Sequence, residues 1–486
     1  MENYIFNTCY KLKNDKDRIL LTNTKDFAMG QIVYFLHPMH AALISFFDGS
    51  GKYEETINRI CDFFEIKREI AENLVSKIIK NKEKVHYSYD GNIFSLPENI
   101  LIPNKDNIVR TDLNRKNYKI EGELNFKRRR LGVPISLLIC INLRCVTDCI
   151  YCYANKKAAY TPLKAEKWVE IIHEAKRIGI ETVDITGGEF FLNPGWEEIT
   201  KAIVECGYEP EISTKVPLSH ETIDKIVETG LESIQFSLDT LNPELAKRNL
   251  KVKDNYINDL LDAIRYCDLK GLKVIIKPSL NKETCTLENV NDIINFAKTL
   301  KNLKRCVFTI IGYSCFKSEQ NYFDIRPSEI QANKVAELVS RRANELSCPM
   351  YNDNQLYFKK DMQNYSKFKD RAVCTANVDG LVALPDGQVT ICEELYWNKN
   401  FLLGDLKENS IEEIWNSAQA LHLWNISQDE YPEDSACKTC YGFKECHQGQ
   451  GVCWKIILSA YGSDNIYQPD PRCPKAPNMI YHFVAD

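Results

Sequence analysis

Hydrophobic positions from Gly132 to Leu346 alternate between short β-favouring runs and longer segments with apolar residues at helical spacing. The short runs predict strands and the longer segments predict amphipathic helices. Six strand-then-helix units in this order indicate a parallel sheet, curved into a barrel or a partial barrel. The predicted strands are 133–141, 182–186, 211–214, 233–238, 273–280 and 306–312. The predicted helices are 164–177, 196–206, 221–228, 256–266, 289–300 and 328–346.

The first 97 residues follow a different pattern. β-favouring stretches at 4–12, 18–22 and 31–36 precede two segments with helical periodicity, 57–64 and 70–79. Asp90-Gly91 then separates two short β-rich segments and predicts a hairpin turn. Strands, two helices and a terminal hairpin predict a winged helix-turn-helix domain over 1–97.

The remaining chain divides into three further parts. Residues 98–131 are polar and charged and predict a linker, in which the basic run 127–130 is expected to be solvated. The barrel is expected over 132–350. Residues 351–486 have shorter elements, frequent Pro and Gly, and seven cysteines. We expect this last domain to depend on bound metal for its order.

Composition excludes several classes of protein. Hydrophobic residues make up 44% of the chain and charged residues 27%, as in ordinary globular proteins. A net charge of −5 and helices without a basic stripe argue against nucleic-acid binding, although winged helices often bind DNA. No apolar run approaches the ~20 residues that span a bilayer, and the N-terminus has no apolar signal core. We therefore expect a cytoplasmic protein with neither nucleic acid nor membrane as partner.

A cluster of cysteines follows the first predicted barrel strand. Cys145, Cys149 and Cys152 are spaced by three and then two residues. Three thiolates in such a loop can bind zinc or an iron–sulfur cluster. Three ligands instead of four leave one coordination position open, as in a catalytic site. Cys140 lies inside the apolar strand and is interpreted as a buried thiol.

This cluster resembles that of the radical S-adenosylmethionine (radical SAM) enzymes, which share the pattern CxxxCx(aromatic)C. Tyr151 occupies the aromatic position. The resemblance implies an α/β fold with a partial (β/α)6 TIM-like radical SAM barrel. It also implies a [4Fe–4S] cluster on the three cysteines and S-adenosylmethionine (SAM) on the fourth iron. Cleavage of SAM would yield a 5′-deoxyadenosyl radical that abstracts a hydrogen atom.

Gly187-Gly188-Glu189, at the end of the second predicted strand, resembles the GGE element of this family. That element meets the amino group of the SAM methionine. Glycines let the backbone approach a ligand closely, and a carboxylate accepts hydrogen bonds from an ammonium group. The family usually has proline after the glutamate, whereas this chain has Phe190.

Four further residues resemble SAM contacts of the family. Ser237 and Asp239 lie on the fourth strand, whose polar residues meet the ribose. Ser213, at the end of the third strand, is a second ribose candidate. Arg248 lies where relatives place an arginine near the SAM carboxylate. For Ser213 and Arg248, a capping or solvated role is an equal alternative.

Seven cysteines in the C-terminal region resemble the SPASM extension of radical SAM enzymes, which binds two auxiliary [4Fe–4S] clusters. Gly387 precedes the second of them in a G-x4-C pattern. The resemblance implies a distal set of ligands, Cys437, Cys440, Cys446 and Cys473, and a proximal set, Cys374, Cys392 and Cys453. A pair of zinc knuckles is the alternative.

The second cluster departs from the family pattern at two points. Relatives usually show C-x3-C where this chain has Cys446-x6-Cys453, with Gln450 at the expected position. Only three proximal ligands are found. Either Cys348 supplies the fourth, or one iron is open to substrate.

The predicted domain order resembles that of peptide-modifying maturases of ribosomally made natural products (RiPPs). Their N-terminal domain is a recognition element that binds the leader of a precursor peptide by strand addition. The resemblance implies an oxidoreductase and peptide cyclase that cross-links a core residue, with a Cys thioether favoured over carbon–carbon or ether bonds. It also implies two partners, the precursor peptide and an electron donor such as flavodoxin or ferredoxin.

Two alternatives belong to other classes of protein. One is a maturase of a folded protein, as in sulfatase-activating relatives. The other is a non-catalytic, metal-stabilised peptide- or DNA-binding protein. The sequence identifies no catalytic acid or base.

Overall fold

The computed structural model describes residues 2–23, 33–89, 91–155, 159–314, 319–346, 350–353, 368 and 371–479. The chain forms two compact units, Met1–Val133 and Pro134–Asp486. No helix within the described ranges is long and apolar enough to cross a membrane.

The described part of the first unit contains short antiparallel sheets and three α-helices. Its three-stranded sheet has the order β2-β3-β4, β1 pairs with β7, and β5 and β6 form the predicted hairpin around Gly91, whose φ is 70°. The strands are β1 (Tyr4–Phe6), β2 (Lys11–Asn14), β3 (Ile19–Thr22), β4 (Val33–Leu36), β5 (Val85–Tyr89), β6 (Asn92–Leu96) and β7 (Leu101–Pro103). The helices are α1 (Pro38–Ile44), α2 (Tyr53–Phe64) and α3 (Arg68–Ile79). Asp90, the other predicted turn residue, lies outside the described residues.

The segment 98–131, expected to be a linker, packs within this first unit. It supplies β7, and the side chain of Tyr118 is 3% exposed in the apolar core. The Arg110 guanidinium donates hydrogen bonds to three backbone carbonyls of residues 6–10, at 2.9 to 3.3 Å. Arg130, in the basic run expected to be solvated, is 1% exposed. Its carbonyl accepts a hydrogen bond from the buried Arg18 at 3.1 Å.

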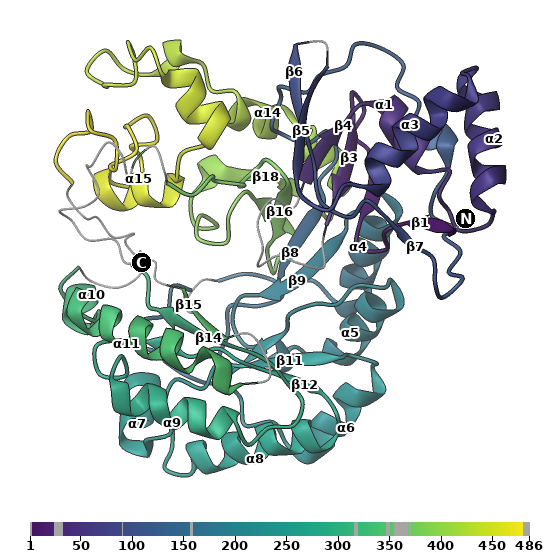
Figure 1. Ribbon diagram of the computed structural model, residues 1–486. Helices are drawn as coiled ribbons and strands as arrows, with labels where there is room; N and C mark the ends of the chain where they lie inside the picture. The colour runs from purple at the N-terminus through teal and green to yellow at the C-terminus, as the bar shows by residue number, and fades with distance from the viewer. Residues whose placement is uncertain are drawn as a thin grey trace. The chain divides into compact units, whose positions relative to one another are not determined.

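The second unit contains the predicted partial barrel, with its strands divided between two sheets (Figure 1). One sheet includes the parallel pair β8 (Ser136–Cys140) and β9 (Thr182–Thr186). The other is parallel, in the order β10-β11-β12-β14-β13, with β15 also paired to β14. Its strands are β10 (Ser213–Thr214), β11 (Ser233–Phe236), β12 (Lys273–Ile276), β13 (Ser279–Leu280), β14 (Leu303–Ile310) and β15 (Met350–Asp353).

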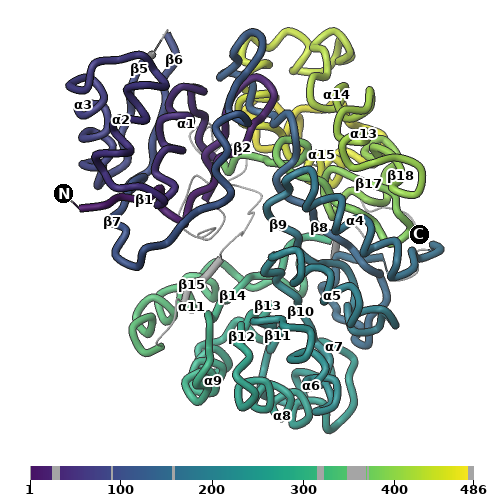
Figure 2. The backbone as a smooth tube through the Cα atoms, turned by 90° about the vertical axis from the view of Figure 1, so that its right-hand side faces the viewer, coloured from purple at the N-terminus to yellow at the C-terminus, as the bar shows by residue number. Residues whose placement is uncertain are grey.

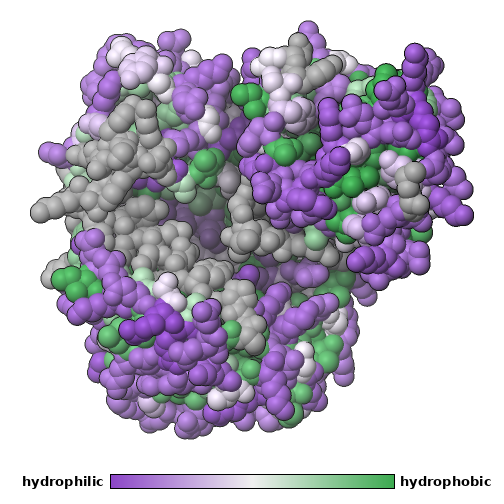
Figure 3. Space-filling model, viewed as in Figure 1, coloured by the Kyte–Doolittle hydropathy of each residue, from purple (hydrophilic) through white to green (hydrophobic). Residues whose placement is uncertain are grey.

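Amphipathic helices cover the outer side of the second of these sheets (Figure 2). Their apolar faces are buried and the surface over α7 to α9 is mainly hydrophilic (Figure 3). The helices of the barrel are α4 (Ala165–Arg177), α5 (Trp196–Glu205), α6 (His220–Glu228), α7 (Pro243–Leu250), α8 (Tyr256–Leu269), α9 (Leu287–Ala297), α10 (Glu319–Ile325) and α11 (Glu329–Arg342). Burial of these faces supplies the main driving force for the fold.

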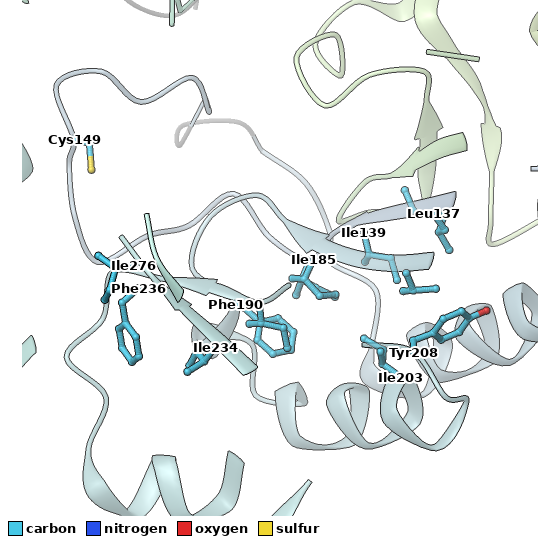
Figure 4. Close-up of a cluster of buried hydrophobic side chains, with 14 of the residues drawn as sticks. Leu137, Ile139, Cys149, Ile185, Phe190, Ile203, Tyr208, Ile234, Phe236 and Ile276 are labelled. Carbon is cyan, nitrogen blue, oxygen red and sulfur yellow. The ribbon is translucent and has the colours of Figure 1, made fainter. Parts of the chain in front are cut away.

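The two sheets share one hydrophobic core (Figure 4). Ile139 and Ile185 come from β8 and β9, and Phe236 comes from β11. Phe190, which is 3% exposed, lies between these groups in the same view. The phenyl ring at the position of the usual proline is therefore part of the barrel core.

The C-terminal region joins the barrel through a strand. β16 (Gly380–Ala383) pairs in parallel with β8, and β17 (Gln388–Thr390) and β18 (Leu402–Asp405) continue the same sheet antiparallel. This extension of the barrel sheet was not predicted. The helices beyond it are α13 (Ile411–Trp415), α14 (Ala418–Trp424), a π-helix over Glu445–Gln450 and α15 (Trp454–Tyr461).

Candidate active site

A cavity of about 280 Å³ lies at the carboxyl ends of the parallel barrel strands. Nine of the predicted site residues line it: the three cysteines, Tyr151, the Gly187–Glu189 turn, Ser213 and Ser237. Ser213 lies in β10, and the others lie in the segments that follow β8, β9 and β11. Barrel folds place their chemistry at this end of the strands.

The loop after β8 is held in place by the hydroxyl of Thr147, which belongs to the loop, and by the end of α7. The Oγ1 of Thr147 lies 3.3 Å from the Sγ of Cys145 and 3.2 Å from the Sγ of Cys149. The backbone N–H groups of residues 148 and 150 donate to carbonyls at the end of α7, at 2.8 and 3.0 Å. Burial raises the pKa of Cys149, so its thiolate needs a cationic or metal partner.

The Gly187-Gly188 turn packs directly against this cysteine loop. Gly187 has φ of 109°, and a Cβ there would meet the Asn142 carbonyl oxygen at 2.5 Å. A Cβ on Gly188 would meet the Arg144 oxygen at 2.0 Å. The N–H of Gly188 donates to the Asn142 carbonyl at 2.6 Å. The two glycines thus bring the end of β9 against the cysteine loop.

Glu189 is a buried carboxylate on the cavity wall, 2% exposed. It accepts hydrogen bonds from the Thr214 hydroxyl at 3.0 Å, the Lys215 N–H at 3.2 Å and the Phe191 N–H at 3.3 Å. The Thr214 hydroxyl lies 3.0 Å from both carboxylate oxygens, so three donor groups share about four acceptor sites. Burial raises the pKa of Glu189 to about 7, against the lowering effect of these donors.

Lys215 is a site residue that the sequence did not reveal. It lines the cavity, and its Nζ lies 2.9 and 3.0 Å from the two carboxylate oxygens of Asp239. Asp239 also accepts hydrogen bonds from the Tyr151 hydroxyl and, at 2.8 Å, from the Ser279 N–H. Asp239 is 3% exposed and lies behind the wall, where it fixes Lys215 and Tyr151. The sequence signal for Lys215 was its position directly after the third strand.

The structure separates the other polar candidates. Ser213 and Ser237 line the cavity, and the Ser237 hydroxyl accepts a hydrogen bond from Gln235 at 3.1 Å. The side chain of Arg248 is 59% exposed and pairs with Glu283 at 3.1 Å. Arg248 therefore lies on the surface of α7 and not on the cavity wall.

The C-terminal region supplies another part of the cavity wall. Glu394 and Lys455 line the cavity and form an ion pair, and each follows a predicted proximal cysteine by two residues. The neighbouring Glu393 accepts hydrogen bonds from the Thr186 hydroxyl at 2.8 Å and the Tyr153 hydroxyl at 3.4 Å. Burial raises the pKa of Glu393. No motif in the sequence pointed to these residues.

The thiols of the distal set influence one another electrostatically. Burial, together with the nearby charges of Cys446, Cys473 and Cys440, raises the pKa of Cys437 to about 12. The pKa of Cys473 is raised mainly by burial and also by the nearby charge of Cys440. Four mutually repelling thiolates form a donor set that bound iron would stabilise.

The proximal set shows the same coupling. Burial, together with the nearby charges of Glu394, Glu393 and Cys453, raises the pKa of Cys392 to about 12. Burial raises the pKa of Cys453 to about 11, and Cys374 contributes. Cys348, the candidate fourth ligand, lies outside the described residues.

The described cysteines do not converge as ligands of a single metal ion would. No group of three His, Cys, Asp or Glu side chains in the described ranges surrounds one point closely enough to bind one ion.

Two family models match the chain. Residues 139–300 match the radical SAM superfamily, and residues 374–441 match SPASM, an iron–sulfur cluster-binding domain. Together they include the cysteine loop, the Gly187–Glu189 turn and four of the seven C-terminal cysteines.

Several known proteins are similar to this chain, some over most of its length and others over less than half. A PqqA peptide cyclase of Rhizobium meliloti (strain 1021) is 25% identical over 355 residues, which are 72% of this chain and 89% of that protein. A probable GTP 3',8-cyclase of Methanocaldococcus jannaschii is 29% identical over 218 residues, 43% of this chain and 69% of that protein. The crystal structure of Streptococcus suis SuiB bound to precursor peptide SuiA has a TM-score of 0.65 and 17% identity, covering 97% of this chain and 99% of that one. The last similarity establishes a common fold.

Proposed function

We propose that this chain, which carries a radical SAM domain and an iron–sulfur cluster-binding SPASM domain, modifies a ribosomally made precursor peptide. A radical SAM domain uses SAM and a [4Fe–4S] cluster, and a SPASM domain binds auxiliary iron–sulfur clusters. The observation that carries the proposal is the shared cavity. The radical SAM motifs line it together with Glu394 and Lys455 from the C-terminal region.

The residues for each cofactor follow from their positions in the cavity. Cys145, Cys149 and Cys152 would hold the SAM-binding cluster. Glu189 on the cavity wall would accept the SAM ammonium, and Ser213 and Ser237, which line the same cavity, would contact the ribose. When bound, the cluster and SAM would supply the 5′-deoxyadenosyl radical. Asp239 acts through Lys215 and Tyr151, and the exposed Arg248 has no place in this arrangement.

The auxiliary clusters would be held by the two coupled sets. Cys437, Cys440, Cys446 and Cys473 form the distal set, and Cys374, Cys392 and Cys453 form the proximal set. The electrostatic coupling within each set supports this division. The fourth proximal ligand would be either Cys348 or a substrate group bound at an open iron.

A peptide substrate is supported by the named relatives and by the architecture. The alignments with two PqqA peptide cyclases cover about nine tenths of those proteins. The SuiB structure is a complex with a precursor peptide, SuiA. The first unit would be a winged-helix recognition element. Its three-stranded sheet has β2 and β4 at its edges, where a leader peptide can add as a further strand.

The reaction we propose is an intramolecular cross-link, with a Cys thioether as the first candidate. Hydrogen abstraction gives a carbon radical on a core residue. Bond formation to a thiol sulfur would then release one proton to solvent and one electron to an auxiliary cluster. The electron that cleaves SAM would come from a donor such as flavodoxin or ferredoxin. The peptide loses two hydrogens in total.

Mass spectrometry of the peptide tests this proposal. The reduced, cluster-loaded enzyme is incubated with SAM and a precursor peptide encoded next to it. We expect 5′-deoxyadenosine and a peptide lighter by two hydrogens, with thiol alkylation blocked at the linked cysteine. A reaction without SAM is the control. Formation of 5′-deoxyadenosine with an unchanged peptide would contradict the cross-link.

SAM affinity should fall as the pH is lowered through 7. The pKa of Glu189 is about 7 in the fold, so its carboxylate is mostly ionised at pH 8 and mostly protonated at pH 6. A protonated Glu189 no longer attracts the SAM ammonium, and we expect roughly tenfold weaker binding over this interval. Calorimetric titration of the anaerobic, loaded protein with SAM measures it.

The matched variant is Glu189→Gln. It should bind SAM weakly at both pH values, without the pH dependence. The stability of the fold changes with pH in the opposite direction to SAM affinity. Because the pKa of Glu189 is higher in the folded than in the unfolded chain, its ionisation destabilises the fold as the pH rises from about 4.5 through 7. A wild-type affinity that does not change between pH 6 and 8 would rule out this role of Glu189.

A further inference from the structure

Arg371 is a buried arginine in the C-terminal region, 8% exposed, that no motif singled out. Its guanidinium lies 4.0 Å from the centre of the Phe368 ring. It donates hydrogen bonds to the Phe368 carbonyl at 2.7 Å and to the Gly451 carbonyl at 3.1 Å. These contacts hold a full positive charge in one position, because arginine stays protonated in proteins.

The same guanidinium reaches a predicted cluster ligand. Nη2 of Arg371 lies 3.3 Å from the Sγ of Cys446 and 3.3 Å from its carbonyl oxygen. A donor that carries positive charge bonds more strongly to a negatively charged acceptor than a neutral donor does. The guanidinium therefore stabilises negative charge on this sulfur.

Arg371 also contacts the position where relatives have a cysteine. Its Nη1 donates to the Gln450 side chain at 2.6 Å, and the Gln450 carbonyl accepts from the Cys374 N–H at 2.9 Å. The longer loop between Cys446 and Cys453 is thus tied to the arginine. Arg371 and Gln450 together connect a distal ligand with a proximal one.

One polar atom of Arg371 has no acceptor within the described ranges. Its Nε is buried and without a hydrogen-bond partner there. Buried donors in native proteins are nearly always satisfied. A sulfur-rich group bound by the neighbouring Cys446 would supply acceptors, so the site fits an iron–sulfur cluster.

The other charged groups near Cys446 leave the arginine dominant. Asp470 is neutralised by a buried ion pair with Arg472, at 2.7 Å. The His447 ring stacks against the Phe443 ring, with the ring centres 4.1 Å apart. Arg371 is the cation that hydrogen-bonds to the Cys446 sulfur.

We propose that Arg371 tunes the distal auxiliary cluster by donating a charge-assisted hydrogen bond to the Cys446 sulfur, which raises the cluster's reduction potential. Hydrogen bonds to cluster sulfurs and nearby positive charge stabilise the reduced, more negative state. This inference rests on the proposed function, because it takes Cys446 as a distal ligand.

The test is a redox titration of the loaded full-length protein, followed by electron paramagnetic resonance. The distal signal is identified by its loss in Cys440→Ala. In Arg371→Met we expect that signal to titrate at a lower potential. The equilibrium constant for reduction of the distal cluster should fall at least tenfold, which is a shift of 59 mV for a one-electron couple. Arg371→Lys keeps the positive charge but loses the planar guanidinium, so it should lower the distal potential by a smaller amount.

Arg342→Met is the matched control. Arg342 is likewise mostly buried, with its side chain 13% exposed, but it pairs with Glu345 on the barrel surface. It should leave the distal potential unchanged. Unchanged potentials in both Arg371 variants, or loss of the distal cluster from both, would overturn the tuning role. Absence of a distal signal from the wild-type protein would instead refute the cluster assignment in the proposed function.

Discussion

Replacing Cys145, Cys149 and Cys152 together by alanine is expected to abolish reductive cleavage of SAM. The three thiolates line the cavity, and without them the cluster that cleaves SAM has no protein ligands. No 5′-deoxyadenosine should form with dithionite as reductant. Iron analysis should show the loss of roughly one third of the iron of a protein with three [4Fe–4S] clusters. Chromatography of the nucleoside products and iron analysis measure the two effects.

Cys140→Ala is the control for this experiment. Cys140 lies at the end of β8, close to the cysteine loop, but its pKa of about 12 is raised mainly by burial and its Sγ contacts the Asn142 carbonyl. The variant should keep both its iron and its 5′-deoxyadenosine formation. If the triple variant still cleaved SAM at the wild-type rate, the radical SAM assignment of these cysteines would fail.

Removal of residues 1–133 should lower kcat/KM for the precursor peptide by about 100-fold or more. If the first unit binds the leader, it raises the effective concentration of the core at the cavity, an effect that reaches 10² to 10⁴. SAM cleavage without peptide should continue, because the cavity belongs to the second unit. Parallel assays of peptide mass and 5′-deoxyadenosine separate the two activities.

A leaderless core peptide is the control substrate. It should react equally slowly with the full chain and with the truncated chain. The cut belongs after 133 and not after 97. A cut at 97 removes β1 and leaves its partner β7, together with the apolar side chain of Tyr118, without their packing. Equal processing of the full precursor by both proteins would favour the maturase of a folded protein.

Much of the barrel could be predicted from hydrophobic patterning. The strand 182–186 and the helix over Ala165–Arg177 agree with the predicted ranges to within one residue. The predicted strand 273–280 is divided into β12 and β13 on either side of Pro278, because proline cannot donate to a sheet. α7 was missed, although Asn242-Pro243 is a capping signal, because its apolar face is short.

The site was less predictable where it depends on the meeting of distant segments. The Gly187–Glu189 turn could be found because its residues are adjacent in sequence. Glu394 and Lys455 are 61 residues apart and meet only through the fold. Lys215 was missed and Arg248 was proposed, since spacing along the chain does not show which cation faces the cavity.

The linker expectation failed for a related reason. Residues 98–131 are rich in charge, which is typical of solvated segments. Arg110 and Arg130, however, are covered by backbone carbonyls and by the apolar core of the first unit. Buried arginines of this kind cannot be distinguished from exposed ones by composition.

The parallel pairing of β16 with β8 limits how this protein can be dissected. A barrel expressed only to residue 353 would present β8 as an open edge, with unpaired backbone groups that invite intermolecular aggregation. The two strands are more than 200 positions apart, so their union closes a very long loop and should come late in folding. The cysteine-rich region is therefore not an exchangeable module, and chimaeras that graft it onto another barrel should be joined before β16, with the recipient's own first strand matched to it.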